Sequence, residues 1–294
     1  MKNLKKVLAA IITGIIIAGA FVGCSKASTA ASGEKKNDSA QSTSSSSLDE
    51  IKKRGTIRIG VFSDKPPFGY VDSQGKNQGF DVYIAKRFAK DLLGDESKVE
   101  FVLVEAANRV AVLESNKVDI TMANFTVTEE RKQKVDFANP YMKVSLGVVS
   151  PDGAKITSVD QLKGKKLIVN KGTTAQAYFE KNFPDIELLK YDQNTEAFEA
   201  LKDKRGAALA HDNTEVLAWA KSNPGFSVGI ATLGGQDTIA PAVKKGNKEL
   251  LDWINSELET LGKENFIHKA YDETLKSIYG NDPSNIVIEG GKLQ

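Results

Sequence analysis

Val144-Ser-Leu-Gly-Val-Val-Ser150 is an extended, mostly apolar stretch that separates two series of alternating strands and helices. The pattern upstream of it predicts strands at 56–62, 99–104 and 118–122 and helices at 79–92 and 108–116. A further helix is expected to start near Thr126 or Thr128. This strand–helix alternation predicts a parallel sheet with right-handed crossovers.

A second series follows the extended stretch and predicts another α/β unit. Its strands are expected at 167–170, 186–190, 207–210 and 226–230, and its helices at 173–182, 194–202 and 213–222. Asp237-Thr-Ile-Ala-Pro-Ala-Val243 is again extended, and the helices after it carry an apolar stripe that includes Leu250 and Leu258. Two extended crossings predict a chain that leaves one lobe and later returns to it. The expected fold is α/β, with two lobes, a two-strand hinge and a cleft between the lobes.

The N-terminal segment has the pattern of an export signal. A basic start, Met1-Lys-Asn-Leu-Lys-Lys6, precedes an apolar run from Val7 to Val22 that is short for a membrane span. The run ends at Ala20-Phe-Val-Gly-Cys24, which resembles a bacterial lipobox, although Phe21 departs from the usual leucine. Cys24 is the only cysteine, so it is the expected lipidation site and no internal disulfide is possible.

Residues 25–47 are rich in Ser, Ala, Thr, Lys and Gly and contain no large apolar side chain. Such a segment cannot bury enough surface to order itself, which predicts a flexible tether. We therefore expect a signal peptide at 1–23, a lipidated cysteine and tether at 24–47, and an extracytoplasmic protein held at the cell membrane through lipid on Cys24.

Composition excludes several classes of function. The 294 residues are 40% hydrophobic and carry 40 basic and 38 acidic side chains, a formal charge of +2. Without a basic excess, no nucleic-acid partner is expected. His211 and His268 lack zinc-ligand spacing, no Gly-x-Ser-x-Gly elbow is present, and His211 is expected to be structural. No catalytic residue, metal or cofactor is predicted.

Three segments should face the cleft, because ligands of open α/β sheets bind at the carboxyl ends of strands. The first is Asp64-Lys-Pro-Pro-Phe-Gly-Tyr70, in which paired prolines stiffen a loop. Phe68 and Tyr70 are candidates for an aromatic wall of the ligand site. The alternative is a turn with one aromatic in the core, which is favoured for Phe68.

The second segment is Ala123-Asn-Phe-Thr-Val-Thr-Glu-Glu-Arg131. Thr126-Val-Thr-Glu129 fits a capping box, and a helix N-terminus offers free N–H groups to a carboxylate. Arg131 adds a bidentate fork for the same carboxylate. The alternative is a surface salt bridge from Arg131 to Glu130 or Asp136.

The third segment lies in the second series. Asn170-Lys-Gly-Thr-Thr174 repeats the anion-binding pattern with Gly172 and hydroxyls. Asp212 follows a strand and should accept a ligand ammonium, while it could also cap the next helix. Together these segments predict a receptor for a zwitterion. Arg109, at the start of a helix, could add a cationic contact, although taken alone it reads as a surface residue.

The order of these motifs resembles the family 3 extracellular solute-binding proteins, the polar amino-acid receptors of ABC importers. The similarity covers nearly all of residues 48–280, and its motifs are the lipobox, Ile59-Gly-Val, Pro66-Pro-Phe68, Gly79-Phe-Asp81, Val118-Asp-Ile120, Thr126-Val-Thr-Glu-Glu-Arg131, Asp136-Phe-Ala-Asn-Pro-Tyr141 and Lys171-Gly-Thr-Thr174. The resemblance implies a two-lobe type II periplasmic-binding-protein fold, with residues 48–146 and 242–294 in lobe 1 and 147–241 in lobe 2.

The resemblance also implies roles for individual residues. Arg131 and Thr126 would bind the ligand α-carboxylate together with Thr174 from the other lobe. Asp212 would bind the α-amino group, helped by the backbone carbonyl of Asn124.

The ligand is expected to be an L-amino acid, with cysteine first. Segments including Glu105-Ala-Ala-Asn-Arg109 and Tyr191-Asp-Gln-Asn-Thr195 are similar to those of cysteine-binding receptors. Lys65 stands where receptors for basic amino acids place an aromatic, which disfavours a long cationic ligand. An arginine like Arg109 also occurs in receptors for acidic amino acids, so aspartate and glutamate stay open.

The expected partners are a free amino acid and a membrane-embedded ABC permease, and the protein is expected to be a monomer. Two other classes stay open. Relatives on this fold include periplasmic dehydratases and lyases, and a surface adhesin with a vestigial cleft is the other alternative.

Overall fold

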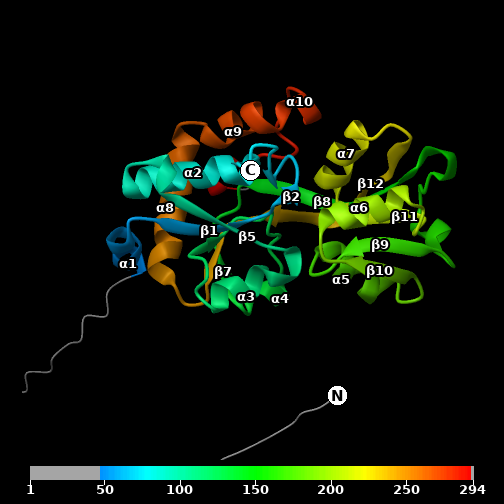
Figure 1. Ribbon diagram of the computed structural model, residues 1–294, viewed down its shortest axis with the longest axis horizontal. Coiled ribbons are helices and arrows are strands. Elements are labelled where there is room, and N and C mark those ends of the chain that lie inside the picture. Colours follow the sequence, from blue (N-terminus) through cyan, green and yellow to red (C-terminus); the bar gives the residue numbers. More distant parts are fainter. Residues whose placement is uncertain (1–46, 293–294) are drawn as a thin grey trace, which may run out of the picture. The chain divides into compact units, whose positions relative to one another are not determined.

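The computed structural model describes residues 47–292, which form two lobes, each with a five-stranded sheet between layers of helices (Figure 1). The predicted signal peptide, Cys24 and the tether up to residue 46 lie outside the described residues. The described part begins with α1 (Ser47–Arg54). The α/β fold with two lobes and two chain crossings is confirmed, whereas the predicted lobe boundaries stay a prediction.

Lobe 1 contains the sheet β5-β1-β6-β13-β7. Its strands are β1 (Ile57–Val61), β5 (Val99–Leu103), β6 (Ile120–Thr121), β7 (Val135–Phe137) and β13 (Ala242–Lys244). Strands β1, β5 and β6 pair in parallel, and β13 is antiparallel to both of its neighbours. The parallel part of the predicted sheet is therefore present, although β6 pairs over only two residues.

Helices cover both faces of this sheet. They are α2 (Phe80–Leu93), α8 (Lys248–Lys263), α9 (Phe266–Thr274) and α10 (Lys276–Tyr279) on one side, and α3 (Arg109–Glu114) and α4 (Glu129–Lys132) on the other (Figure 1). The apolar stripe of α2 buries Phe80, Ile84 and Phe88, and α2 ends at Gly94 in a left-handed conformation. In α8 the predicted stripe, including Leu250 and Leu258, is fully buried.

Lobe 2 contains the sheet β10-β9-β11-β8-β12. Its strands are β8 (Met142–Pro151), β9 (Lys166–Asn170), β10 (Glu187–Tyr191), β11 (Ala208–Asp212) and β12 (Phe226–Ile239). Helix α5 (Thr174–Asn182) packs on one face, and α6 (Asn194–Lys202) and α7 (Asn213–Ser222) pack on the other. All of the elements predicted for the second series are present.

Strands β8 and β12 join the two lobes. They pair in antiparallel fashion from Phe226 with Pro151 to Ile239 with Met142, with three register shifts between. The sequence suggested a strand at 226–230 and a separate extended crossing at 237–243, whereas residues 226–239 form one irregular strand. Bulges allow such a strand to bend and twist between two sheets.

A small sheet of β2 (Asp64–Lys65), β3 (Gly69–Val71) and β4 (Asn77–Gln78) lies at the edge of lobe 1. It holds the proline loop against α2. Phe68 is buried in the lobe 1 core, whereas Tyr70 is partly exposed. The core alternative for Phe68 is therefore correct.

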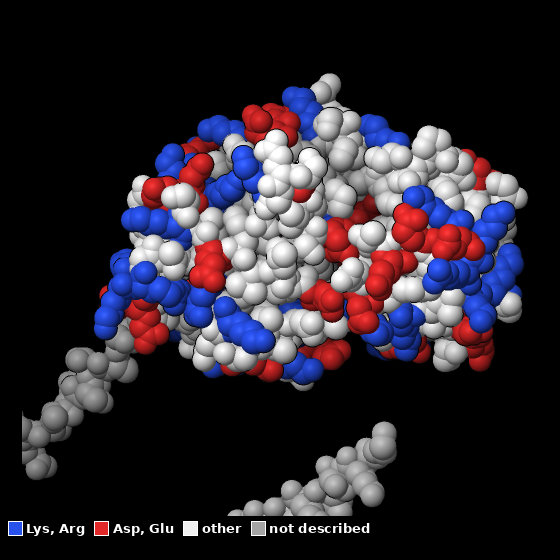
Figure 2. All heavy atoms as spheres, viewed as in Figure 1, with Lys and Arg blue, Asp and Glu red and all other residues white. Residues whose placement is uncertain are grey.

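The surface is hollowed between the lobes. Figure 2 shows this hollow on the same face as Figure 1, with atoms of Asp and Glu (red) along its lobe 2 side. None of the helices between residues 47 and 292 is both long and apolar enough to cross a membrane.

Candidate ligand-binding site

A buried ion pair joins the lobes at the carboxyl end of β11. Asp212 Oδ2 accepts hydrogen bonds from Lys65 Nζ and from Asn124 Nδ2, each at 2.9 Å. Asp212 is 4% exposed and Lys65 is 1% exposed. A carboxylate of lobe 2 therefore meets an ammonium and an amide of lobe 1 away from water.

The backbone directs both partners to this meeting point. Asp212 occupies the N-cap position of α7, but its side chain makes no capping hydrogen bond. The predicted capping role of Asp212 is therefore not observed, and its predicted role toward a ligand ammonium stays a prediction. Asn124 has a left-handed backbone (φ 45°), which asparagine tolerates, and its N–H donates to Asp81 Oδ2 at 2.7 Å.

The electrostatics of the pair favour a charged carboxylate. Burial alone would raise the pKa of Asp212, but the hydrogen bond and charge of Lys65, together with the neighbouring His211 and Arg109, lower it overall. His211 stays neutral, because burial lowers its pKa to about 3, and its Nδ1 accepts the backbone N–H of Asp212 at 2.7 Å. His211 thus supports the turn that holds Asp212, in keeping with a structural role.

Arg131 lies on a shorter helix than the sequence indicated. The cap of α4 is Thr128, whose hydroxyl accepts from the backbone N–H of Arg131, so the capping box beginning at Thr126 is wrong. With only the four residues Glu129–Lys132, α4 has a weak macrodipole, and the carboxylate site predicted at its N-terminus stays a prediction. The arginine itself is the cationic group here.

The guanidinium of Arg131 points toward the other lobe. One nitrogen donates to the carbonyl of Thr126 at 2.6 Å and the other to the carbonyl of Gly172 at 2.9 Å. Burial lowers the pKa of Arg131 to about 10, so it stays charged at neutral pH. The alternative surface pair is not observed, because Asp136 binds Lys245 at 2.6 Å and Glu130 lies 3.8 Å from Lys134.

Arg109 is buried, contrary to the surface position that its sequence context suggested. It is 3% exposed, and burial and the nearby Arg131 lower its pKa. Its guanidinium donates at 3.0–3.1 Å to the carbonyls of Ala106, Ala123, Asn124 and Gly172. Both guanidiniums lie against the ring of Phe125, with that of Arg109 4.5 Å and that of Arg131 4.8 Å from the ring centroid.

The cluster has an excess of positive charge. Three cationic side chains, those of Lys65, Arg109 and Arg131, stand against Asp212. Asp81 adds only part of a charge near neutrality, because burial raises its pKa to about 7. A buried site with this balance favours a ligand that brings a carboxylate.

Arg131, Gly172 and Thr174 line one cavity of about 370 Å³ between the lobes. Thr174 begins α5, and Thr173 is its N-cap. Gly172 has φ +72°, and a Cβ there would lie 2.5 Å from Cα of Ala107 in lobe 1, so glycine permits this close approach. The structure thus brings together the two segments predicted to bind a carboxylate. Thr126 is buried beside them.

Asn170 is a site candidate that the sequence reasoning missed. It ends β9, is 1% exposed and lines a cavity of about 210 Å³ together with Phe62 and Ala106. Within residues 47–292 neither side-chain atom of Asn170 has a hydrogen-bond partner, and the same holds for Oδ1 of Asn124. Buried amides without partners suit a polar ligand. The sequence feature that could have identified Asn170 is its position as a polar residue at the carboxyl end of a buried strand.

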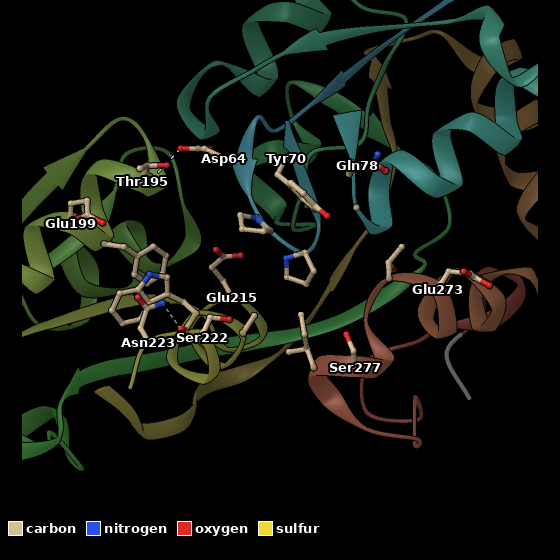
Figure 3. A pocket seen from close by; sticks show the side chains of 18 residues that line it. Asp64, Tyr70, Gln78, Thr195, Glu199, Glu215, Ser222, Asn223, Glu273 and Ser277 are labelled. Atoms are coloured by element: carbon tan, nitrogen blue, oxygen red, sulfur yellow. Dashed lines mark hydrogen bonds between the residues drawn. The ribbon is translucent and has the colours of Figure 1, made fainter. Parts of the chain in front are cut away.

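Tyr70 and Phe68 are not brought to this cluster. Tyr70 lines a separate cavity of about 580 Å³, whose lining includes neither Arg131 nor Asp212 (Figure 3). Across the described ranges, no group of His, Cys, Asp and Glu side chains is arranged to hold a metal ion.

Comparison with known proteins places this arrangement in a family. Residues 57–277 match the model of the bacterial extracellular solute-binding proteins, family 3. The chain belongs to this family. The resemblance noted from the sequence is therefore confirmed.

Two solved structures are similar to this family 3 solute-binding protein over most of its length. A cysteine-binding protein from Campylobacter jejuni is 62% identical, with a TM-score of 0.82, and the match covers 83% of this chain and 99% of that one. A solute receptor for L-cysteine from Neisseria gonorrhoeae is 59% identical, with a TM-score of 0.81, and the match covers 82% and 99% of the two chains. These similarities confirm the two-lobe fold.

A curated relative of this solute-binding protein is the ABC transporter glutamine-binding protein of Bacillus subtilis. It is 35% identical over 262 residues, which cover 87% of this chain and 92% of the relative. Because the family is extracellular, this solute-binding protein is extracytoplasmic.

Proposed function

We propose that the protein is a lipid-anchored receptor that binds L-cysteine between its two lobes and delivers it to an ABC permease. The observation that carries the choice of cysteine is the 62% and 59% identity to two solved cysteine-binding proteins over more than four fifths of the chain. The buried cluster of opposite charges supports a zwitterionic ligand independently of that similarity.

In this proposal the two ends of the ligand bind to different parts of the cluster. The α-carboxylate accepts from the Arg131 fork and from Thr174 and Thr126, in exchange for the carbonyl oxygens that Arg131 contacts now. The α-ammonium binds Asp212, where Lys65 is the competing cation. The carbonyl of Asn124 is the further acceptor, which Arg109 already contacts at 3.1 Å.

Lobe closure follows from this division of contacts. Arg131 belongs to lobe 1 and Asp212 to lobe 2, so one small zwitterion can satisfy both only when the lobes are together. Charge-assisted hydrogen bonds in a site without water then supply the affinity.

Isothermal titration with a panel of amino acids tests the proposal. L-cysteine should bind with 1:1 stoichiometry and more tightly than glutamine, arginine or glutamate. Failure of every amino acid to bind at about 1 mM would sink the proposal, since that affinity corresponds to only about 4 kcal/mol of binding free energy.

A second candidate ligand is an acidic amino acid. The observation that favours it is the excess of buried positive charge, because Arg109 could pair with a second carboxylate. Tighter binding of aspartate or glutamate than of cysteine in the same titrations would establish this candidate instead.

Several parts of the proposal rest on the family and the sequence pattern. Delivery to a permease follows from the role of the relatives in ABC transport, and lipid anchoring rests on the motif that ends at Cys24. A binding rather than catalytic role is favoured because Asp212 is already paired with Lys65, and His211 is buried with a pKa lowered to about 3, which makes it a weak base.

A further inference from the structure

The cavity of about 580 Å³ in Figure 3 lies outside the amino-acid site and has its own chemistry. Lobe 1 contributes residues from the proline loop and from α9 and α10, including Tyr70 and Glu273. Lobe 2 contributes residues from α6 and α7, including Glu215 and Trp219. A volume of this size exceeds what a free cysteine needs and is within the range of about 300–1,000 Å³ typical of small-molecule sites.

The lining contains acidic side chains and no basic one. Its four acidic residues are Asp64, Glu199, Glu215 and Glu273, and none of the described lining residues is a lysine, arginine or histidine. Asp64 is partly committed, because its carboxylate accepts from Asn194 Nδ2 and from the backbone N–H of Thr195, both at 3.2 Å. Glu199 is likewise paired, with Lys202 Nζ at 2.7 Å. Because the lining holds carboxyl groups and no basic side chain, it favours a cationic over an anionic ligand.

Glu215 is the residue whose environment most directly indicates a ligand site. It lies in the first turn of α7, is only 2% exposed, and its carboxyl projects into the cavity in Figure 3. Its Oε2 has no hydrogen-bond partner within the part of the chain that the structure describes. A buried carboxyl without a partner is costly for the fold unless it serves a ligand.

Part of the cavity wall is apolar and aromatic. Phe198 and Trp219 stack with ring centroids 4.6 Å apart, and both line the cavity together with Pro66 and Pro67. Aromatic faces near carboxylates are the usual surroundings of bound organic cations. We propose that this cavity is a second ligand site, which binds an organic ammonium ion with an apolar body and places the nitrogen against Glu215.

Binding of such a cation should release a proton. The pKa of Glu215 is raised to about 8, chiefly by burial and to a smaller extent by the neighbouring Asp212 and Asp64, while Lys65 opposes the rise. Tyr279 also faces Glu215, but its hydroxyl donates to the carbonyl of Thr214 at 2.6 Å and its own pKa is raised by burial, so it is neutral. At pH 7 the carboxyl is therefore mostly protonated, and a bound ammonium displaces roughly 0.9 proton.

Titration calorimetry with phenethylamine, cadaverine and agmatine tests the site, with 2-phenylethanol as the uncharged control. At least one amine should bind with 1:1 stoichiometry and a Kd below about 1 mM, and 2-phenylethanol at least about tenfold more weakly. Repeating the titration in two buffers of different ionisation enthalpy should detect the released proton. Absence of amine binding at about 10 mM would overturn the proposal.

Three variants locate the amine. Glu215→Gln should weaken amine binding at least tenfold and abolish the proton release, whereas Glu259→Gln, on α8 outside the cavity, should change the Kd less than twofold. Glu273→Gln, at the exposed rim, should weaken binding severalfold, which keeps the test valid if Glu215→Gln folds poorly. Unchanged amine binding in both cavity variants contradicts the proposal.

Arg131→Ala separates this site from the amino-acid site, whichever amino acid that site binds. Amine affinity should be unchanged in this variant, because Arg131 does not line the cavity. If the variant lost amine binding together with amino-acid binding, the amine would bind at the amino-acid site, and the proposal of a second site would be wrong.

Discussion

At the scale of single residues, the hydrogen-bond acceptors of Arg131 are neutral carbonyl groups. Its guanidinium lies over the ring of Phe125 and donates to carbonyl oxygens of both lobes. Neutral carbonyls are weaker partners for a guanidinium than a carboxylate, which accepts two parallel charge-assisted bonds. Exchange of these partners is therefore favourable when a carboxylate enters.

We expect Arg131→Ala to weaken the binding of every amino acid ligand by at least about 100-fold, because two charge-assisted hydrogen bonds are lost. Arg131→Lys, which keeps the charge but not the fork, should recover only part of the affinity. Titration calorimetry of both variants measures the effect. Equal affinities of the Lys variant and the wild type would show that charge alone suffices.

The ion pair of Lys65 with Asp212 should be important for stability in the absence of ligand. Lys65→Met leaves the buried Asp212 without its cation and should lower the free energy of unfolding by about 3–5 kcal/mol. The matched control is Lys245→Met, which breaks the more exposed pair with Asp136 and should cost at most about 1 kcal/mol. Urea unfolding measures both changes, and similar losses in the two variants would contradict the prediction.

Glu215 should make stability depend on pH. Its pKa is raised from 4.5 to about 8 in the folded protein, so the unfolded chain loses this proton at lower pH than the folded protein does. Stability from the protonated form is fully present below pH 4.5 and is lost as the pH rises toward 8. The maximum loss is about 5 kcal/mol, at about 1.4 kcal/mol per pKa unit.

Glu215→Gln removes this titration. The stability of the variant relative to the wild type should therefore increase between pH 4.5 and pH 8, as measured by urea unfolding at several pH values. A stability difference that does not change with pH would show that Glu215 does not titrate in this window.

At the scale of elements, the turn between β9 and α5 limits how closely the lobes approach. Gly172 lies against the backbone of Ala107 in lobe 1, and its carbonyl accepts from both Arg109 and Arg131. The turn thus brings the backbones of the two lobes close together and accepts hydrogen bonds from two cationic side chains.

Gly172→Ala should hold the lobes apart, because its Cβ would lie 2.5 Å from Cα of Ala107. Gly164→Ala is the matched control, since Gly164 also has φ +72° but nothing lies within 4 Å of an added Cβ. Both variants carry the same backbone strain, about 1 kcal/mol. Only Gly172→Ala should lose ligand affinity, by at least tenfold in titration calorimetry; equal losses would point to strain alone.

Local patterns in the sequence predicted long elements well and short ones poorly. The stripes of α2 and α8 follow from the spacing of their apolar residues, whereas β2 and β4 have two residues each and carry no periodicity. The long, irregular β12 was predicted only in part, because bulges and its glycines interrupt the alternation of side chains.

Contacts between lobes were beyond prediction from local pattern. Lys65 and Asp212 are 147 residues apart, and no local signal indicates that they pair. Arg109 was expected at the surface because nothing in its local sequence indicates burial. It is buried because it donates to carbonyl groups of several loops, one of them in the other lobe. The cleft-facing positions of Asp212 and Gly172 were predictable because both follow strands.

At the scale of the whole molecule, membrane attachment is the part of the proposed function that depends on residues outside the described range. Cys24→Ser should abolish labelling by radioactive palmitate and release the protein into the soluble fraction of the producing bacterium. Ser25→Ala, which leaves the thiol in place, is the control and should stay membrane-bound. Retention of the Cys24→Ser protein in the membrane fraction would favour an uncleaved apolar anchor.

The docking of α1 has a consequence for which lobe moves. Ser47 Oγ donates to Asn247 Oδ1 at 2.7 Å, so the described chain starts against the beginning of α8 in lobe 1. Near the other end of the described chain, an isolated antiparallel bridge joins Val287 to Met142, and both residues belong to the hydrophobic core of lobe 1. Lobe 2 is entered through β8 and left through β12. A receptor anchored through Cys24 would therefore be connected to the membrane through lobe 1, and lobe 2 would move relative to lobe 1 when a ligand binds or leaves.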